Sequence, residues 1–95
     1  MDQRWYLAID LGTGGIKVAA VHEDGHVMAS AFRSVDTTIV AGGGTEQDPA
    51  EWWSGVVSAA QEIVGQVAAT ATELACAGVG ITGQLGSTVP VDAAG

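Results

Sequence analysis

Positive charge is scarce in this sequence. Its 95 residues include three Lys or Arg against eleven Asp or Glu, which gives a formal net charge of −8. A nucleic-acid binder needs a basic stripe to displace counterions, and an anionic membrane surface attracts polybasic segments. We therefore expect no nucleic-acid partner and no membrane partner. A phosphate ligand would have to be held by backbone amides, a metal ion or one of the few cations.

Cysteine and long apolar runs are also lacking. Cys76 is the only cysteine, so no disulfide can form within the chain. The residues around it, 74–77, predict the buried start of a strand, where a free cysteine packs as a small core residue. No apolar run approaches the roughly 20 residues that span a bilayer, and the N-terminus lacks the layout of a signal peptide. We expect a cytoplasmic protein.

Glycine, by contrast, is abundant. It accounts for 14 of the 95 residues, about double its usual share. Hydrophobic residues make up 47% of the chain, which excludes a disordered tail, and the length allows one small domain. The glycine content predicts many tight turns or close approaches of the backbone to a ligand.

The first third of the chain predicts an antiparallel meander. Asp24-Gly25 is a strong hairpin turn signal, because this dipeptide readily adopts positive φ angles. Residues 36–45 include three consecutive glycines and predict an irregular loop. The three strands of the meander are expected at residues 5–11, 16–22 and 27–35.

A helix is predicted to begin sharply at Asp48-Pro49. Asp48 can accept from the first free amides, Pro49 suits the first helical position and Glu51 would complete a capping box. The helix should end between residues 68 and 72. Its apolar residues recur at helical spacing and predict one core-facing stripe of Trp53, Val56, Val57, Ala60, Ile63, Val64 and Val67.

Two more strands are expected after the helix, at residues 77–82 and 87–92. The predicted order is therefore β-β-β-α-β-β in an α/β fold. The sequence stops at a predicted turn, with no helix to cover the second face of the sheet. We therefore expect residues 1–95 to be a truncated part of a larger lobe.

The turn at residues 10–17, Asp-Leu-Gly-Thr-Gly-Gly-Ile-Lys, carries the strongest functional signal. A Walker-type P-loop or a dinucleotide fingerprint would open a helix, whereas the residues after Lys17 favour a strand. We interpret the turn as a phosphate-binding hairpin. Glycines allow backbone amides to point at an anion, Lys17 supplies charge and Asp10 suits Mg²⁺. The competing interpretation is a plain glycine-rich hairpin that Asp10 caps.

This turn resembles the first phosphate motif of the actin, Hsp70 and sugar-kinase superfamily. Two further segments narrow the resemblance to the N-terminal lobe of the FGGY carbohydrate kinases, the family of xylulokinase, gluconokinase and glycerol kinase. They are Glu-Gln-Asp-Pro-Ala-Glu-Trp-Trp at 46–53 and Gly-Ile-Thr-Gly-Gln at 80–84. The resemblance covers essentially all 95 residues and implies a ribonuclease-H-like fold.

The resemblance also implies an activity, transfer of the ATP γ-phosphoryl group to a sugar hydroxyl with Mg²⁺ as cofactor. In the family the first hairpin faces the ATP phosphates. Carried over, Asp10 becomes the ligand of the Mg²⁺ waters and Lys17 neutralises charge, while Gly12, Thr13 and Gly14 form the phosphate cradle. The catalytic base and the adenosine pocket of the family fall outside these residues, so the fragment alone should be inactive. The full-length protein is compatible with a homodimer.

The sugar-facing loop of the family corresponds here to Gln84-Leu85-Gly86. Glycerol kinases carry Gln-Arg-Glu at these positions, which disfavours glycerol for this chain. Xylulokinases carry Gln-Met-His-Gly. Leu85 matches the methionine in size, whereas Gly86 replaces the histidine that contacts the sugar and leaves room for a larger group. The resemblance therefore implies a pentulose-like sugar or related polyol, nearest the xylulokinase branch.

Four aromatic side chains invite functional interpretations that have simpler alternatives. Trp53 lies on the helical stripe, so we expect core packing. Trp52 lies beside the stripe and either lines a sugar cleft or is partly buried. His22 and His26 flank the Asp24-Gly25 turn, and no third ligand is evident to complete a metal site.

Two alternatives to the kinase remain open at this point. An actin- or Hsp70-type ATPase fragment would share the turn at residues 10–17 but not the segments at 46–53 and 80–84. A truncated open reading frame without catalytic function would be at best a weak binding module.

Overall fold

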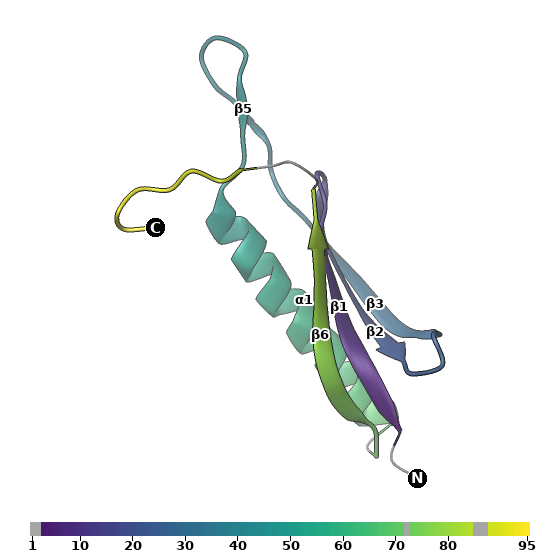
Figure 1. The fold of residues 1–95 in the computed structure, drawn as a ribbon. Coiled ribbons are helices and arrows are strands. Elements are labelled where there is room, and N and C mark those ends of the chain that lie inside the picture. Colours follow the sequence, from purple (N-terminus) through teal and green to yellow (C-terminus); the bar gives the residue numbers. More distant parts are fainter. Residues whose placement is uncertain (1–2, 72, 85–87) are drawn as a thin grey trace.

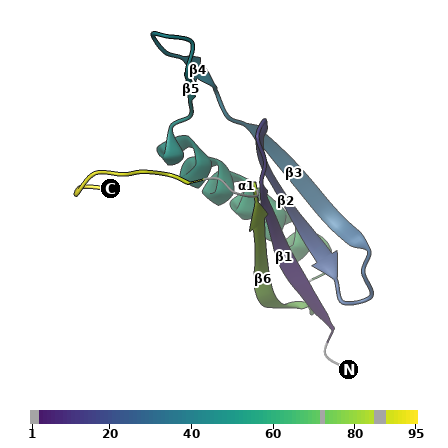
Figure 2. The same cartoon turned by 45° about the horizontal axis from the view of Figure 1, so that its top comes forward.

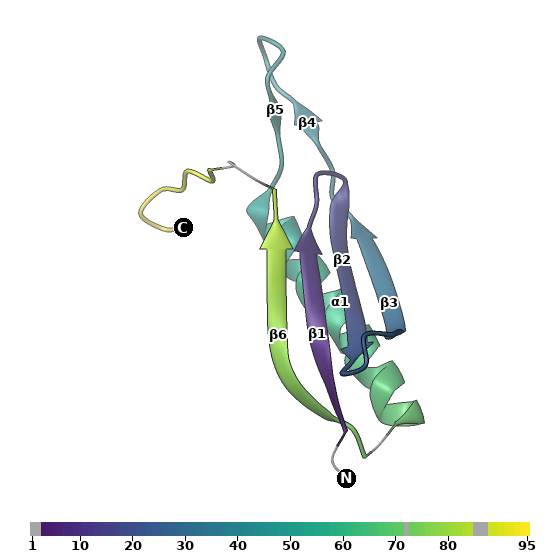
Figure 3. The same ribbon diagram turned by 45° about the vertical axis from the view of Figure 1, so that its right-hand side comes forward.

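The computed structural model describes residues 3–71, 73–84 and 88–95. It contains a four-stranded sheet with the order β3-β2-β1-β6 and a long helix that packs on one face of that sheet (Figures 1 and 3). The strands of this sheet are β1 (Arg4–Leu11), β2 (Gly15–His22), β3 (Val27–Ser34) and β6 (Ala75–Gly83).

The first three strands form the predicted antiparallel meander. β1 pairs with β2 and β2 pairs with β3, both antiparallel. The second turn contains Gly25 at φ +99°, a conformation that a residue with a side chain rarely adopts. β6 then joins the other edge of β1 in parallel, because the helix α1 (Pro49–Thr70) carries the chain back along the sheet.

The helix begins and ends where the sequence predicts. Asp48 is the N-cap, and its side chain accepts a hydrogen bond from the Ala50 amide at 2.9 Å. The predicted capping box is wrong in one respect. The Glu51 carboxylate accepts from the backbone amide of Asp36 at 3.3 Å instead of from the N-cap amide. It thereby ties the loop after β3 to the first turn of the helix.

The helical face that packs on the sheet is rotated relative to the prediction. Trp53 is 70% exposed, so its predicted role in the core is wrong. The predicted Ile63 and Val67 are buried, but Val64 is exposed, and the helix buries Gly55 and Ala59, which were not predicted. Trp52 packs partly buried beside them. Small residues set this face because they bring the helix close to the sheet. A Cβ added at Gly55 would lie 3.2 Å from a side-chain carbon of Ile16.

The core lies between α1 and alternate residues of the meander. Successive residues of a strand point to opposite faces, so one set packs under the helix and the other set lies on the face away from α1. At the margin of the core, Arg33 of β3 donates hydrogen bonds to two residues of α1, Glu62 at 2.8 Å and Ser58 at 2.9 Å. The buried hydrophobic residues are Trp5, Ile9, Ile16, Val18, Ala20, Val35, Ala59, Ile63 and Val67.

Residues 36–45 are more regular than predicted. Most of them belong to a small hairpin that extends to residue 46, with strands β4 (Thr38–Ile39) and β5 (Thr45–Glu46), separate from the main sheet (Figure 2). Gly42 and Gly43 both have positive φ angles in its turn. The glycines that suggest an irregular loop therefore form the tight turn of a hairpin.

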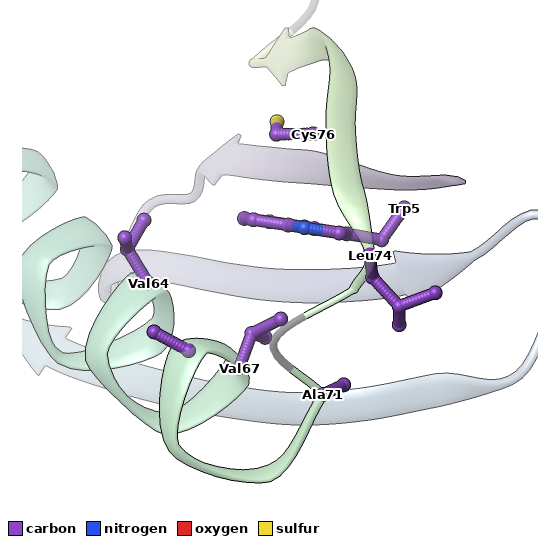
Figure 4. A pocket seen from close by; sticks show the side chains of 7 residues that line it. Trp5, Val64, Val67, Ala71, Leu74 and Cys76 are labelled. Carbon is purple, nitrogen blue, oxygen red and sulfur yellow. The ribbon is translucent and has the colours of Figure 1, made fainter. Parts of the chain in front are cut away.

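The final part of the chain departs from two predictions. β6 is largely exposed, because α1 packs mainly against β2 and β3 and leaves this edge uncovered. Cys76 is accordingly exposed rather than buried, at one side of a hollow of about 240 Å³ between α1 and β6 (Figure 4).

The predicted strand at 87–92 is also wrong over its described residues, because 88–92 are in no strand and have no neighbouring strand to pair with. In the described part of the chain, no helix has the length and hydropathy of a membrane span.

Candidate functional site

The glycine-rich turn joins β1 to β2 as a hairpin, which confirms the predicted arrangement of this segment. Asp10 at the end of β1 lies directly opposite Lys17 near the start of β2. Across the turn the Gly12 amide donates to the Gly15 carbonyl at 2.9 Å. The chain continues into a strand, whereas a P-loop and a dinucleotide fingerprint both continue into a helix.

Gly15 brings the turn into close contact with β3. A Cβ at this position would lie 2.3 Å from the Arg33 carbonyl oxygen and 2.7 Å from the Phe32 ring. Backbone atoms of a paired strand cannot move aside easily, so only glycine fits here. The C-terminal end of the turn therefore packs directly against β3.

We expect Gly15→Ala to destabilise the fold by about 3 kcal/mol, the upper end of the cost of overpacking. Gly14→Ala is the matched control, since an added Cβ there meets nothing within 4 Å and the stability should change by less than about 0.5 kcal/mol. Chemical denaturation of both variants measures the difference. Equal stabilities of the two variants would show that the turn is not held against β3.

Two backbone amides of the turn remain available to a ligand. Among the residues that the structure describes, none accepts a hydrogen bond from the amide of Thr13 or of Gly14, and both residues are exposed. The Gly12 amide, in contrast, is used within the turn. The donors that the turn presents are therefore the amides of Thr13 and Gly14 and the Thr13 hydroxyl.

Asp10 and Lys17 project from the sheet face opposite α1. Their strand neighbours Ile9, Ile16 and Val18 are buried under the helix, so alternation places these two charged side chains on the other face. They line a hollow of about 380 Å³ together with Thr82, which is in register with Asp10 on β6. Neither charge forms an ion pair with any described residue.

Lys17 is the one cation beside the turn that forms no ion pair with the described residues. The sequence has three Lys or Arg residues. Arg4 begins β1 at the opposite end of the sheet, and Arg33 is paired with Glu62 at 2.8 Å. An anion at the turn would therefore meet a single unpaired ammonium group.

The predicted sugar-facing residues begin at the same edge of the sheet. Leu11 at the end of β1 is in parallel register with Gly83 at the end of β6, so Gln84 follows β6 beside the turn (Figures 1 and 3). Leu85 and Gly86 lie outside the described residues. The structure thus brings Asp10, Lys17, the turn and Gln84 to the same end of the sheet.

Gln47 is a contact of the turn that sequence reasoning missed. Its side-chain amide donates to the Thr13 carbonyl at 2.8 Å and accepts from the Trp52 indole at 3.1 Å. Trp52 is therefore partly buried and hydrogen-bonded, the simpler of its two predicted roles. The contact joins two segments recognised separately in the sequence, and no local pattern signals it because 34 positions separate Gln47 from Thr13.

A separate polar cluster lies at the opposite end of the sheet. The Asp24 carboxylate is 2.6 Å from the His26 ring nitrogen Nδ1 and 3.2 Å from that of His22. The argument that no third ligand lies near the histidines is therefore wrong. Hydrogen bonds nevertheless account for the cluster, because His22 Nδ1 accepts from the Asp24 amide and Asp24 also caps the His26 amide.

The same hydrogen bonds predict a pH dependence. The His26 amide, followed by its ring, lowers the pKa of Asp24 from 3.8 to about 2. A lowered pKa in the folded state means that the carboxylate stabilises the turn fully above pH 3.8 and loses this effect as the pH falls through about 2. A carbon NMR titration of Asp24 should give a midpoint near 2. A midpoint at the ordinary value would contradict the capped turn.

Comparison with protein families gives a match over nearly the whole chain. Residues 5–95 match the model of the FGGY family of carbohydrate kinases, N-terminal domain. A xylulose kinase of Staphylococcus epidermidis is 33% identical over 89 residues, which cover 90% of this chain and 17% of the relative. A glycerol kinase of Aquifex aeolicus is 36% identical over 61 residues, covering 64% of this chain and 12% of the relative. The chain therefore spans less than a fifth of these relatives.

Solved structures show the same fold. A crystal structure of a "xyloylose kinase" from Brucella ovis superposes with a TM-score of 0.71 at 33% identity, covering 84% of this chain and 16% of that one. A Plasmodium falciparum glycerol kinase crystallised with ADP has a TM-score of 0.82 at 23% identity, covering 87% and 16%. These neighbours confirm the predicted sugar-kinase fold, of which the described residues contain the β-β-β-α-β part together with the small β4–β5 hairpin.

Proposed function

The chain belongs to the FGGY family of carbohydrate kinases, and on that premise we propose that its glycine-rich hairpin binds the phosphates of ATP in a sugar kinase. The observation that carries the proposal is that the turn, Asp10, Lys17 and the C-terminal end of β6 lie together at the same end of the sheet. An ATP phosphate bound at the turn would lie beside the sugar loop that follows β6. The family match also removes the reason to retain an actin- or Hsp70-type ATPase.

The charges of the site suit a magnesium nucleotide. In a chain of net charge −8, polyphosphate binding depends on local donors. The turn offers two amides that have no acceptor among the described residues, the Thr13 hydroxyl and the Lys17 ammonium. Mg²⁺ prefers one or two carboxylates and keeps several waters. Asp10, which forms no ion pair with the described residues, fits that role. When bound, the ion would neutralise charge on the transferring phosphoryl group.

The proposed reaction is a phosphoryl transfer to an alcohol. The bond between the γ-phosphorus and its bridging oxygen breaks, a bond forms to the sugar oxygen, and the hydroxyl proton passes to a base. The base and the adenosine pocket are proposed to come from residues beyond these 95, so this chain alone should be inactive. The contribution of its own residues is positioning and electrostatic stabilisation.

The proposed acceptor is a pentulose-like sugar or a related polyol, in a xylulokinase-like enzyme. Gln84 follows β6 at the site edge, and Leu85 and Gly86 come directly after it. These residues provide less charge than a glycerol-type loop and more room than one with a histidine at position 86. We also propose a cytoplasmic location, because the single Cys76 is exposed and unpaired.

The experiment that tests the function is an acceptor panel on the full-length protein. Pentuloses, hexuloses and polyols including glycerol are each incubated with Mg-ATP, and both ADP and the phosphorylated product are measured. We expect one ADP per sugar phosphate, with pentuloses preferred and glycerol poor. An absence of acceptor-dependent ADP release with every compound would contradict the kinase assignment.

A further inference from the structure

Gln47 connects three parts of the chain behind the glycine-rich turn. Its Nε2 donates to the Thr13 carbonyl at 2.8 Å and to the Thr37 hydroxyl at 3.0 Å, and its Oε1 accepts from Trp52 Nε1 at 3.1 Å. The residue is partly buried and directly precedes Asp48, the N-cap of α1. The turn is thereby hydrogen-bonded to the loop after β3 and to the first turns of the helix.

The direction of the Gln47 amide is fixed by chemistry. An indole N–H is a donor only, so the atom that faces Trp52 must be the amide oxygen. The amide nitrogen then faces Thr13, and both of its protons are used, one by the Thr13 carbonyl and one by the Thr37 hydroxyl. A flipped amide would lose the hydrogen bonds to Thr13 and Trp52 and would keep only the one to Thr37, with the hydroxyl as donor.

Fixing the Thr13 carbonyl also fixes the next amide. The peptide between Thr13 and Gly14 is trans, because the structure contains no cis peptide bond among the residues it describes. In a planar trans peptide the C=O and N–H point in opposite directions. The Gly14 N–H therefore points away from Gln47, and no described residue accepts from it. Gly14 has no side chain, and its own carbonyl accepts from the Val35 amide at 3.3 Å, which restrains the following peptide. Among the described residues, the hydrogen bond to the Thr13–Gly14 peptide itself comes from Gln47.

We infer that Gln47, oriented by Trp52, is a positioning residue that holds the Thr13–Gly14 peptide with its N–H directed at the bound phosphate. This inference rests on the proposed nucleotide role of the turn. Without the Gln47 donor, the peptide could rotate and offer its carbonyl oxygen to the anion. A carbonyl facing a phosphate is repulsive where an amide is attractive, so the orientation of one peptide decides between binding and repulsion.

The test uses three variants of the full-length protein. Gln47→Leu removes the donor at similar size, Trp52→Phe keeps an aromatic side chain, smaller than the indole, but removes the N–H that orients Gln47, and Thr37→Val removes the neighbouring acceptor alone. We expect Gln47→Leu to raise KM for ATP about tenfold and to lower kcat, with KM for the sugar unchanged. Trp52→Phe should shift KM for ATP in the same direction by a smaller factor, and Thr37→Val should leave it within about twofold.

Comparing KM for ATP with KM for the sugar distinguishes a positioning role of Gln47 from a general loss of stability. A purely structural role would lower the melting temperature and change both KM values together, or change neither, and either result overturns the inference. If Gln47→Leu does not fold, Trp52→Phe decides, because an aromatic side chain still packs at this position and Gln47 itself is unchanged. Lys17→Ala serves as the reference. An effect of Lys17→Ala on ATP kinetics without an effect of Gln47→Leu overturns the positioning role alone, whereas no effect of either removes the proposed function as well.

Discussion

Asp10→Asn is expected to lower kcat/KM for ATP by about a thousandfold at fixed Mg²⁺ in the full-length protein, the upper range for loss of one electrostatic group in a preorganised site. The substitution keeps the size of the side chain and removes its charge. Asp10 lies at the end of β1 on the face away from α1 and has no ion pair with the described residues, so its charge is available to a ligand. A neutral amide holds the waters of Mg²⁺ far less well than a carboxylate does.

Glu23→Gln is the matched control for Asp10→Asn. It makes the same change in net charge at an exposed residue of the β2–β3 turn, at the far end of the sheet. Its ATP kinetics should equal those of the unchanged protein. Raising Mg²⁺ should recover part of the activity of Asp10→Asn, because weaker metal binding is offset by mass action. Full activity of Asp10→Asn at ordinary Mg²⁺ would show that Asp10 only caps the hairpin.

Lys17→Ala is expected to lower kcat/KM for ATP by about a hundredfold. Lys17 is the one cation beside the turn without an ion pair to a described residue, since Arg4 lies at the other end of β1 and Arg33 is paired with Glu62. Its removal leaves polyphosphate binding to amides and Mg²⁺ in a strongly acidic chain. The defect should appear in both KM for ATP and kcat, because charge builds up on the phosphoryl group in the transition state.

Arg4→Ala is the matched control for Lys17→Ala. Both variants remove one exposed positive charge, so an effect of overall charge alone would be the same in each. We expect Arg4→Ala to leave the ATP kinetics unchanged. Unchanged kinetics in a folded Lys17→Ala protein would remove the phosphate assignment of the turn.

Local patterns in the sequence predict much of this fold. The strands of the meander have apolar alternation, the Asp24-Gly25 turn has its own chemistry, and Asp48-Pro49 begins the helix where expected. Each of these features depends on residues close together in the chain. The hairpin at residues 10–17 belongs to the same class, because apolar residues on both sides of the glycines predict strands.

Two of the errors concern which faces are covered. Large apolar residues suggest that Trp53 faces the core, but the small residues Gly55 and Ala59 permit the closest approach of helix and sheet and define the buried face. The apolar sequence of β6 predicts a buried strand, yet α1 packs mainly against β2 and β3 at the other side of the sheet. Periodicity identifies an amphipathic element but does not say which other element covers it.

The sequence predicts the individual residues of the candidate site but not the hydrogen bonds that join its distant segments. Asp10 and Lys17 could be paired from the hairpin alone, since the strands on either side of a short turn face each other. The hydrogen bond between Gln47 and Thr13 depends on how the helix and its preceding loop pack behind the turn. Polar contacts between distant segments follow from the assembled fold and leave no periodic trace in the sequence.

The most direct test of the central claim is an amide NMR titration of the isotope-labelled full-length protein with Mg-ADP. If the turn binds the nucleotide phosphates, the amide signals of Thr13 and Gly14 should shift strongly with a common affinity, while that of Gly25 at the far end should stay in place. Saturable binding of Mg-ADP without any shift at Thr13 and Gly14 would contradict the account.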